Sequence, residues 1–127
     1  MPFIAFNKTT ELLAADDLHI NPGAVLYVEA SRPDQIGHTC IYMLGQGEAV
    51  NAVEESIETV VSRMGGLIAA KRHYLAPLPL ESVGTVYLSP TNVSYARPNA
   101  PASPTFWVLR FVDGSELRVM APLPEGF

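Results

Sequence analysis

Apolar and polar positions alternate with a period of two over several short stretches of this chain, which is the pattern of half-buried β-strands. The two clearest hairpins run over residues 39–50, with a turn at Gly45-Gln46-Gly47, and over residues 106–119, with a turn at Asp113-Gly114. Asp-Gly between two strand-like runs is a strong hairpin signal, and it predicts a type I′ turn. The chain is therefore rich in antiparallel strands.

The two halves of the chain resemble each other. Residues 18–28 are similar to residues 86–96, and Pro22 and Pro90 at their centres lie 68 positions apart. Each segment is followed by a polar loop that contains proline, and then by one of the two hairpins. In the second half this loop covers residues 98–104, and we interpret it as a long hairpin loop stiffened by proline; the alternative is a polyproline recognition segment.

Only the first half has an apolar stripe at helical spacing, formed by Val53, Ile57, Val60, Val61 and Met64. This stripe predicts an amphipathic helix over residues 52–64. Asn51 is its expected N-cap, and Glu54 completes a capping box. Gly65-Gly66 supplies the positive φ that ends it, although residues 67–72 can add a further helical turn.

These patterns predict a mainly β fold of the α+β class, built from two degenerate antiparallel β-meander repeats with one amphipathic helix between them. The chain has 127 residues, a length that suits one compact domain. We expect this domain to consist of one β-rich part over about residues 1–66, which holds the helix, and a second over about residues 75–127 without a helix.

The second hairpin is apolar on both faces. One face carries Trp107, Leu109 and Phe111, and the other carries Phe106, Val108 and Val112. A sheet that is apolar on both sides must bury both, and one short chain has little left to cover the second side. We therefore expect a homo-oligomer: a non-enzymatic accessory protein that binds itself and another protein. Trp107, Leu109 and Phe111 are the predicted contact residues, with the two aromatic side chains as anchors.

Charge is unevenly distributed along the chain, whose formal net charge is −5. Residues 1–64 hold nine acidic and three basic residues, a net charge of −6, whereas residues 65–127 hold four acidic and five basic residues, a net charge of +1. An acidic first half argues against a grip on a phosphate backbone. The alternative function is a small nucleic-acid-binding regulator, which would use Lys71, Arg72, Arg97, Arg110 and Arg118.

Candidate chemistry is sparse. His38 and Cys40 share one face of a strand, but no second cysteine or zinc-ligand spacing accompanies them, so we expect no enzyme activity, no metal and no cofactor. Glu54, Glu55 and Glu58 are interpreted as a solvated helix face. A single cysteine excludes an intrachain disulfide and favours a reducing cytoplasm. No apolar run reaches the roughly 18 residues of a membrane span, and no signal peptide is predicted.

Residues 20–64 resemble the small flagellar proteins of the FlbD/SwrD type and similar short phage and bacterial proteins. The matching positions are Asn21, Val25, Val28-Glu29, Gly47, Val50 and the run from Val53 to Val60. The resemblance implies strands, a glycine turn and a following helix, with no recognisable catalytic group. It also implies a binding or accessory role, such as a phage or mobile-element protein that serves as a virion component or inhibits a host system.

Overall fold

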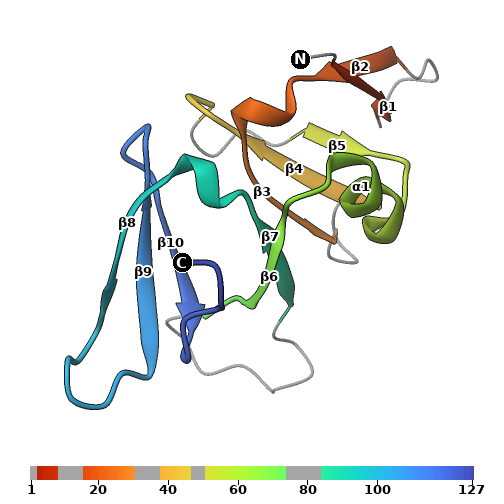
Figure 1. Ribbon diagram of the computed structural model, residues 1–127. Helices are drawn as coiled ribbons and strands as arrows, with labels where there is room; N and C mark the ends of the chain where they lie inside the picture. The colour runs from red at the N-terminus through yellow and green to blue at the C-terminus, as the bar shows by residue number, and fades with distance from the viewer. Residues whose placement is uncertain (1–2, 9–15, 31–37, 47–50, 74–83) are drawn as a thin grey trace.

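The computed structural model describes residues 3–8, 16–30, 38–46, 51–73 and 84–127, whose strands form two antiparallel sheets (Figure 1). In spatial order, the large sheet contains β2 (Asp16–Ile20), β1 (Ile4–Lys8), β5 (Asn51–Val53), β4 (Thr39–Met43), β3 (Val25–Ala30), β7 (Thr85–Leu88) and β6 (Ile68–Lys71). The small sheet contains β10 (Glu116–Met120), β9 (Phe106–Phe111) and β8 (Val93–Pro98). The α-helix α1 (Ile57–Met64) and the 3₁₀ turns η1 (Pro22–Ala24) and η3 (Pro90–Asn92) complete the described elements. The prediction of a mainly β fold with one helix is confirmed.

The large sheet separates two hydrophobic cores. Between this sheet and α1, on the side away from the small sheet in Figure 1, the buried side chains are Phe6, Ile20, Val25, Val28, Ile41, Val53 and Val60. Between the two sheets, the buried side chains are Leu26, Tyr27, Ala70, Val86, Leu88, Leu109, Phe111, Leu117 and Val119. The helix thus covers one face of the large sheet, and the small sheet covers the other.

Strands β3 and β8 follow the same local path. Each is six residues long, each begins directly after a 3₁₀ turn with a proline first, and their starting residues are 68 positions apart. Each also has an irregular register after its first residue, at Val25/Tyr27 and at Val93/Tyr95. The sheets around them differ, because β3 lies inside a seven-stranded sheet and β8 at the edge of a three-stranded one. The interpretation as two meander repeats stays a prediction.

The two 3₁₀ turns lie against each other and connect the sheets. The side-chain amide of Asn92, which is buried, donates to the carbonyl oxygens of Gly23 and Val25 at 2.8 and 2.7 Å. Nearby, the backbone N–H of Gly45 donates to a carboxylate oxygen of Asp113 at 3.0 Å. Buried carbonyl groups need such partners, so these bonds fix the small sheet relative to the large one.

The helix is shorter than predicted. It begins at Ile57, and its N-cap is Ser56, whose hydroxyl accepts from the backbone N–H of Thr59. Asn51, the predicted N-cap, belongs instead to β5 and pairs with Ile41 of the neighbouring strand. The prediction of a helix from residue 52 is therefore wrong at its N-terminal end, because sheet pairing overrides local helix propensity there. Gly65, with a φ of 68°, ends the helix as expected.

The residues after the helix also form a strand rather than a further helical turn. β6 (Ile68–Lys71) pairs antiparallel with β7 over all four of its residues. Ala70 is buried between the sheets. The second predicted hairpin is confirmed as β9–β10, but its turn is not type I′. That turn type needs a positive φ at both central residues, and Gly114 has one whereas Asp113 does not. The predicted strand over residues 48–50 lies outside the described residues.

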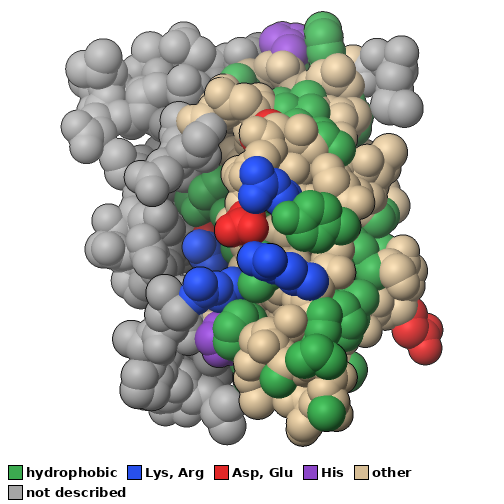
Figure 2. All heavy atoms as spheres, turned by 90° about the vertical axis from the view of Figure 1, so that its left-hand side faces the viewer, with side chains coloured by type: hydrophobic (Ala, Val, Ile, Leu, Met, Phe, Trp, Pro, Cys, Tyr) green, Lys and Arg blue, Asp and Glu red, His purple; other side chains and the backbone are tan. Residues whose placement is uncertain are grey.

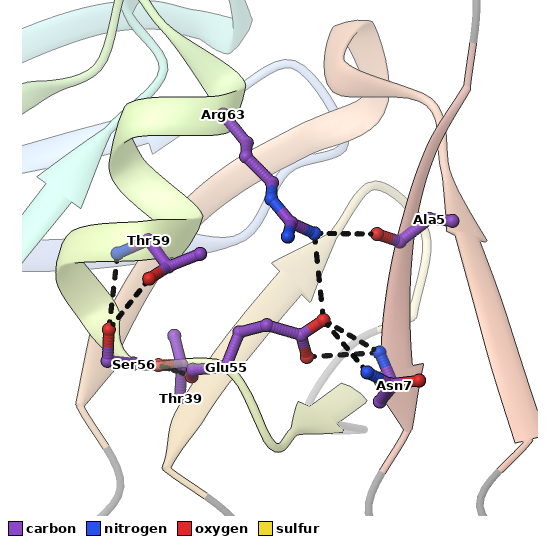
Figure 3. A network of polar contacts seen from close by, with 7 residues as sticks. All are labelled: Ala5, Asn7, Thr39, Glu55, Ser56, Thr59 and Arg63. Carbon is purple, nitrogen blue, oxygen red and sulfur yellow. Dashed lines mark hydrogen bonds and ion pairs between the residues drawn. The ribbon is translucent and has the colours of Figure 1, made fainter.

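Glu55, just before α1, connects the start of this helix to β1 through hydrogen bonds (Figure 3). Its carboxylate oxygens accept from the backbone N–H of Asn7 at 3.0 and 3.1 Å, and Arg63 lies 3.7 Å from one of them. Arg63 also donates to the carbonyl oxygen of Ala5 at 3.2 Å. On the other side, the hydroxyl of Thr39 donates to the backbone carbonyl of Glu55 at 2.7 Å. The interpretation of Glu55 as part of a solvated helix face is therefore wrong.

Candidate partner-binding face

The side chains predicted to contact a partner point into the protein. Leu109 is 0% exposed and Phe111 is 1% exposed, both within the core between the sheets. The ring of Phe111 stacks on Tyr27 of the large sheet, with ring centroids 5.8 Å apart. Trp107, two residues before Leu109, is half-buried against the same core. The prediction of a partner surface at Leu109 and Phe111 is wrong, because the large sheet already covers that face of β9.

Within the described ranges, no helix or strand packs on the opposite face of the small sheet. Because side chains alternate along a strand, the observed register places the following residues on that side: Tyr95, Arg97, Phe106, Val108, Arg110, Glu116, Arg118 and Met120. We call this set the outer face. In the space-filling view, Lys and Arg side chains gather beside hydrophobic ones over this part of the molecule (Figure 2). Three of the five basic residues of the alternative prediction are thus brought together.

The outer face mixes cationic and aromatic groups in contact with each other. Arg118 lies over the ring of Phe106, with its guanidinium carbon 5.4 Å from the ring centroid. The imidazole of His73 stacks on the same ring at a centroid distance of 4.2 Å. Tyr95 is 46% exposed, which is high for an aromatic side chain on a sheet. The contact with Phe106 holds the guanidinium of Arg118 in place over a half-buried aromatic ring.

The charge of the outer face is opposite in sign to that of the whole chain. Three arginines against one glutamate give this face a formal charge of +2, whereas the chain carries −5. Arg110 and Glu116 lie 3.6 Å apart, and both side chains are more than two-fifths exposed. A solvated pair of this kind contributes little to stability, so both groups can exchange partners. Arg97 is exposed at the edge strand.

The other two predicted basic residues are engaged elsewhere. Lys71 belongs to β6 and donates to the hydroxyl of Thr85 at 2.9 Å. Arg72 lies 2.7 Å from a carboxylate oxygen of Glu29, and the hydroxyl of Tyr42 donates to the same oxygen at 2.8 Å. Burial, with the neighbouring Glu29 carboxylate as a second cause, raises the pKa of Tyr42 well above its ordinary range. Arg72 therefore has a structural role beside the inter-sheet core.

The described residues contain no group of three or more His, Cys, Asp or Glu side chains placed to hold a metal ion. His38 is exposed, whereas Cys40 is buried at the centre of the large sheet. Within the same ranges, no helix has both the length and the apolar character needed to cross a membrane.

Comparison with protein-family models, curated proteins and solved structures found no match to this chain. The interpretation of the outer face therefore rests on its own geometry. One sequence signal was available for it: a period of two places Arg110 on the same side of β9 as Phe106 and Val108, so only the other side is wholly apolar.

Proposed function

We propose that this protein is a non-enzymatic accessory protein that binds an acidic surface of another protein through the outer face. The observation that carries this proposal is the grouping of Arg97, Arg110 and Arg118 around the exposed ring of Tyr95 and the half-buried ring of Phe106. Arginine and tyrosine are the side chains that most often dominate the free energy of protein interfaces. The positive sign of the face selects a partner with acidic side chains.

A second candidate function is binding of single-stranded nucleic acid. Arginines beside aromatic rings on the face of an antiparallel sheet also suit stacked bases and phosphates. Two features favour a protein partner instead. Glu116 lies within the face and would repel a phosphate backbone, and the chain as a whole is acidic. Proteins that grip such a backbone neutralise several phosphates at once.

The outer face does not support the predicted homo-oligomer. A hairpin with two apolar faces would need a second copy to cover one of them, whereas the outer face is mixed rather than apolar. Self-association stays a prediction, and sedimentation at micromolar concentrations measures it directly.

The test is affinity purification from the organism's lysate, after nuclease treatment, with the tagged protein and its Arg97→Glu, Arg110→Glu double variant. We expect at least one protein whose recovery falls about tenfold with the double variant. Lys71→Glu is the matched control, since it reverses an exposed charge outside the outer face and should leave recovery unchanged. A purified partner should then bind directly with the same pattern.

Recovery that is equal for all three proteins would contradict the proposal. A parallel titration with oligothymidylate separates the second candidate. Binding that falls steeply with salt and is lost in the double variant would favour single-stranded nucleic acid over a protein.

A further inference from the structure

Strand β8 is an edge strand whose outer backbone groups face away from the sheet. Among the strands that the structure describes, it pairs only with β9, and on that side the backbone N–H of Asn99 donates to the carbonyl oxygen of Phe106 at 3.0 Å. At the other end of the strand, Val112 donates to the carbonyl oxygen of Asn92 at 2.9 Å. Since backbone groups alternate in direction along an antiparallel strand, the N–H and C=O of Ala96 point away from β9.

The corresponding edge of β3 is occupied by another strand of the same chain. β3 has the same length, preceding turn and register irregularity as β8, and β7 pairs along its second edge. The central pair on that edge is Val28 with Tyr87, and Ala96 stands 68 positions after Val28. β3 therefore shows that a strand with this turn and this irregular register can pair with an antiparallel neighbour along its second edge.

Pro98, at the end of β8, does not block pairing of another strand along the central part of this edge. A proline or a bulge often protects an edge strand from unwanted pairing, because it removes a donor or twists the strand away. Pro98 corresponds to Ala30 of β3, which lies beyond the three residues of β3 that pair with β7. The three positions that correspond to those residues are Tyr95, Ala96 and Arg97; the N–H groups of Tyr95 and Arg97 face β9, and that of Ala96 faces outward.

The two sides of this edge differ in chemistry. On the inner side, a cavity of about 380 Å³ runs between β8 and the last residues of the chain. Its lining is mostly apolar, with Val93, Ala96, Leu123 and Phe127, and it reaches Ser94 and Tyr95 at the edge. Phe127 is 39% exposed there. On the outer side, the charged group at the edge is Arg97. An added strand would thus place alternate side chains in an apolar groove and beside a guanidinium.

We propose that an extended segment of the protein partner, with alternating apolar and acidic residues, adds to β8 as a fourth antiparallel strand. Backbone hydrogen bonds to Ala96 would supply affinity, and the apolar groove and Arg97 would supply specificity. This inference rests on the proposed function, since it gives the mode by which the acidic partner is bound.

The probe is a synthetic peptide of alternating glutamate and valine, fluorescently labelled, with a peptide of the same composition in block order as its control. Binding is followed by fluorescence anisotropy. We expect the alternating peptide to bind at least tenfold more tightly than the block peptide. Arg97→Glu should weaken binding of the alternating peptide at least tenfold through charge repulsion.

Two substitutions at one position isolate the backbone contribution. Ala96→Pro removes the outward N–H without removing a donor to β9, and we expect at least a tenfold loss of peptide binding. Ala96→Gly retains the N–H and removes only one methyl group from the groove, so it should bind the peptide more tightly than Ala96→Pro does. Circular dichroism establishes that both variants fold. If Ala96→Pro does not, peptides N-methylated at every second amide replace it, and one of the two methylation patterns should abolish binding.

The outcomes separate the two proposals. Peptide or partner binding that is lost in Arg97→Glu, Arg110→Glu but unchanged in Ala96→Pro would overturn strand addition and leave the proposed function standing. Equal binding of the alternating and block peptides would also overturn it. If the protein alone dimerises and Ala96→Pro abolishes the dimer, the occupant of this edge is a second copy, and the assignment to a partner is overturned.

Discussion

Replacing Leu109 with alanine tests which face of β9 lies inside the protein. The side chain is fully buried between the two sheets, where it contributes to a core that includes Phe111, Leu117 and Val119. Removing it loses the transfer free energy of the missing groups and leaves a cavity that the neighbours fill only partly. Such substitutions cost about 2–5 kcal/mol, and we expect about 3 kcal/mol here because strands on both sides limit collapse.

The assay is urea unfolding followed by the fluorescence of Trp107, which is the single tryptophan of the chain and lies two residues from the substitution. With a denaturant dependence of about 2 kcal/mol per molar urea, Leu109→Ala should lower the midpoint by about 1.5 M. Val112→Ala is the matched control, since this side chain directly after the strand is 55% exposed. We expect it to change the free energy of unfolding by less than about 0.5 kcal/mol.

A cost below about 1 kcal/mol for Leu109→Ala would refute this orientation of the small sheet. A cost for Val112→Ala that exceeds the cost for Leu109→Ala would refute it as well. A shift of the register by one residue exchanges the two faces of a strand, so either result would place Phe106 and Val108 inside and would return Leu109 to the partner surface.

Three further substitutions test other contacts. Because the pKa of Tyr42 is raised in the folded protein, the unfolded chain loses this proton first, near pH 10, and stability should fall as pH rises beyond that value. Tyr42→Phe should reduce that fall, as measured by melting temperature between pH 9 and 11; an unchanged profile would contradict the assigned cause. Asn92→Ala leaves the buried carbonyl group of Val25 and the part-buried one of Gly23 without their donor and should cost about 2 kcal/mol in urea unfolding, whereas a cost near zero would contradict the role of these bonds. Glu55→Ala frees the backbone N–H of Asn7, so hydrogen exchange should accelerate in β1 and stay slow in β8; acceleration of both would indicate global destabilisation instead.

The hairpin of β9 and β10 was predictable from the sequence, but the face of β9 that lies inside was not predicted from it. Both sides of the run contain large apolar residues, so apolar content alone does not distinguish them. The deciding residue is Arg110, which alternation places beside Phe106 and Val108 and away from Leu109. The polar residues of β10 opposite to it give the same answer. The positions of the charged residues in β9 and β10 therefore indicate which face of the small sheet is the outer face.

The errors between residues 51 and 71 have a different origin. Val53 fits both a helical stripe and a short strand, and the glutamates that follow it favour a helix N-terminus. Its place in β5 is decided by pairing with Thr39 in a distant part of the chain. Likewise, Ala69 and Ala70 favour a helix locally, and β6 exists because β7 lies beside it. No local pattern contains that information, since it depends on long-range contacts.

The difference between β3 and β8 links the fold to the proposed binding mode. β7 pairs along the second edge of β3, and β6 pairs along the other edge of β7. The segment after β10 contains Pro122 and Pro124, which have no N–H to donate to an edge. Instead of pairing, its residues line the groove beside β8. The unpaired edge therefore meets the outer face at Arg97, where one substitution should weaken both strand addition and recognition of acidic side chains.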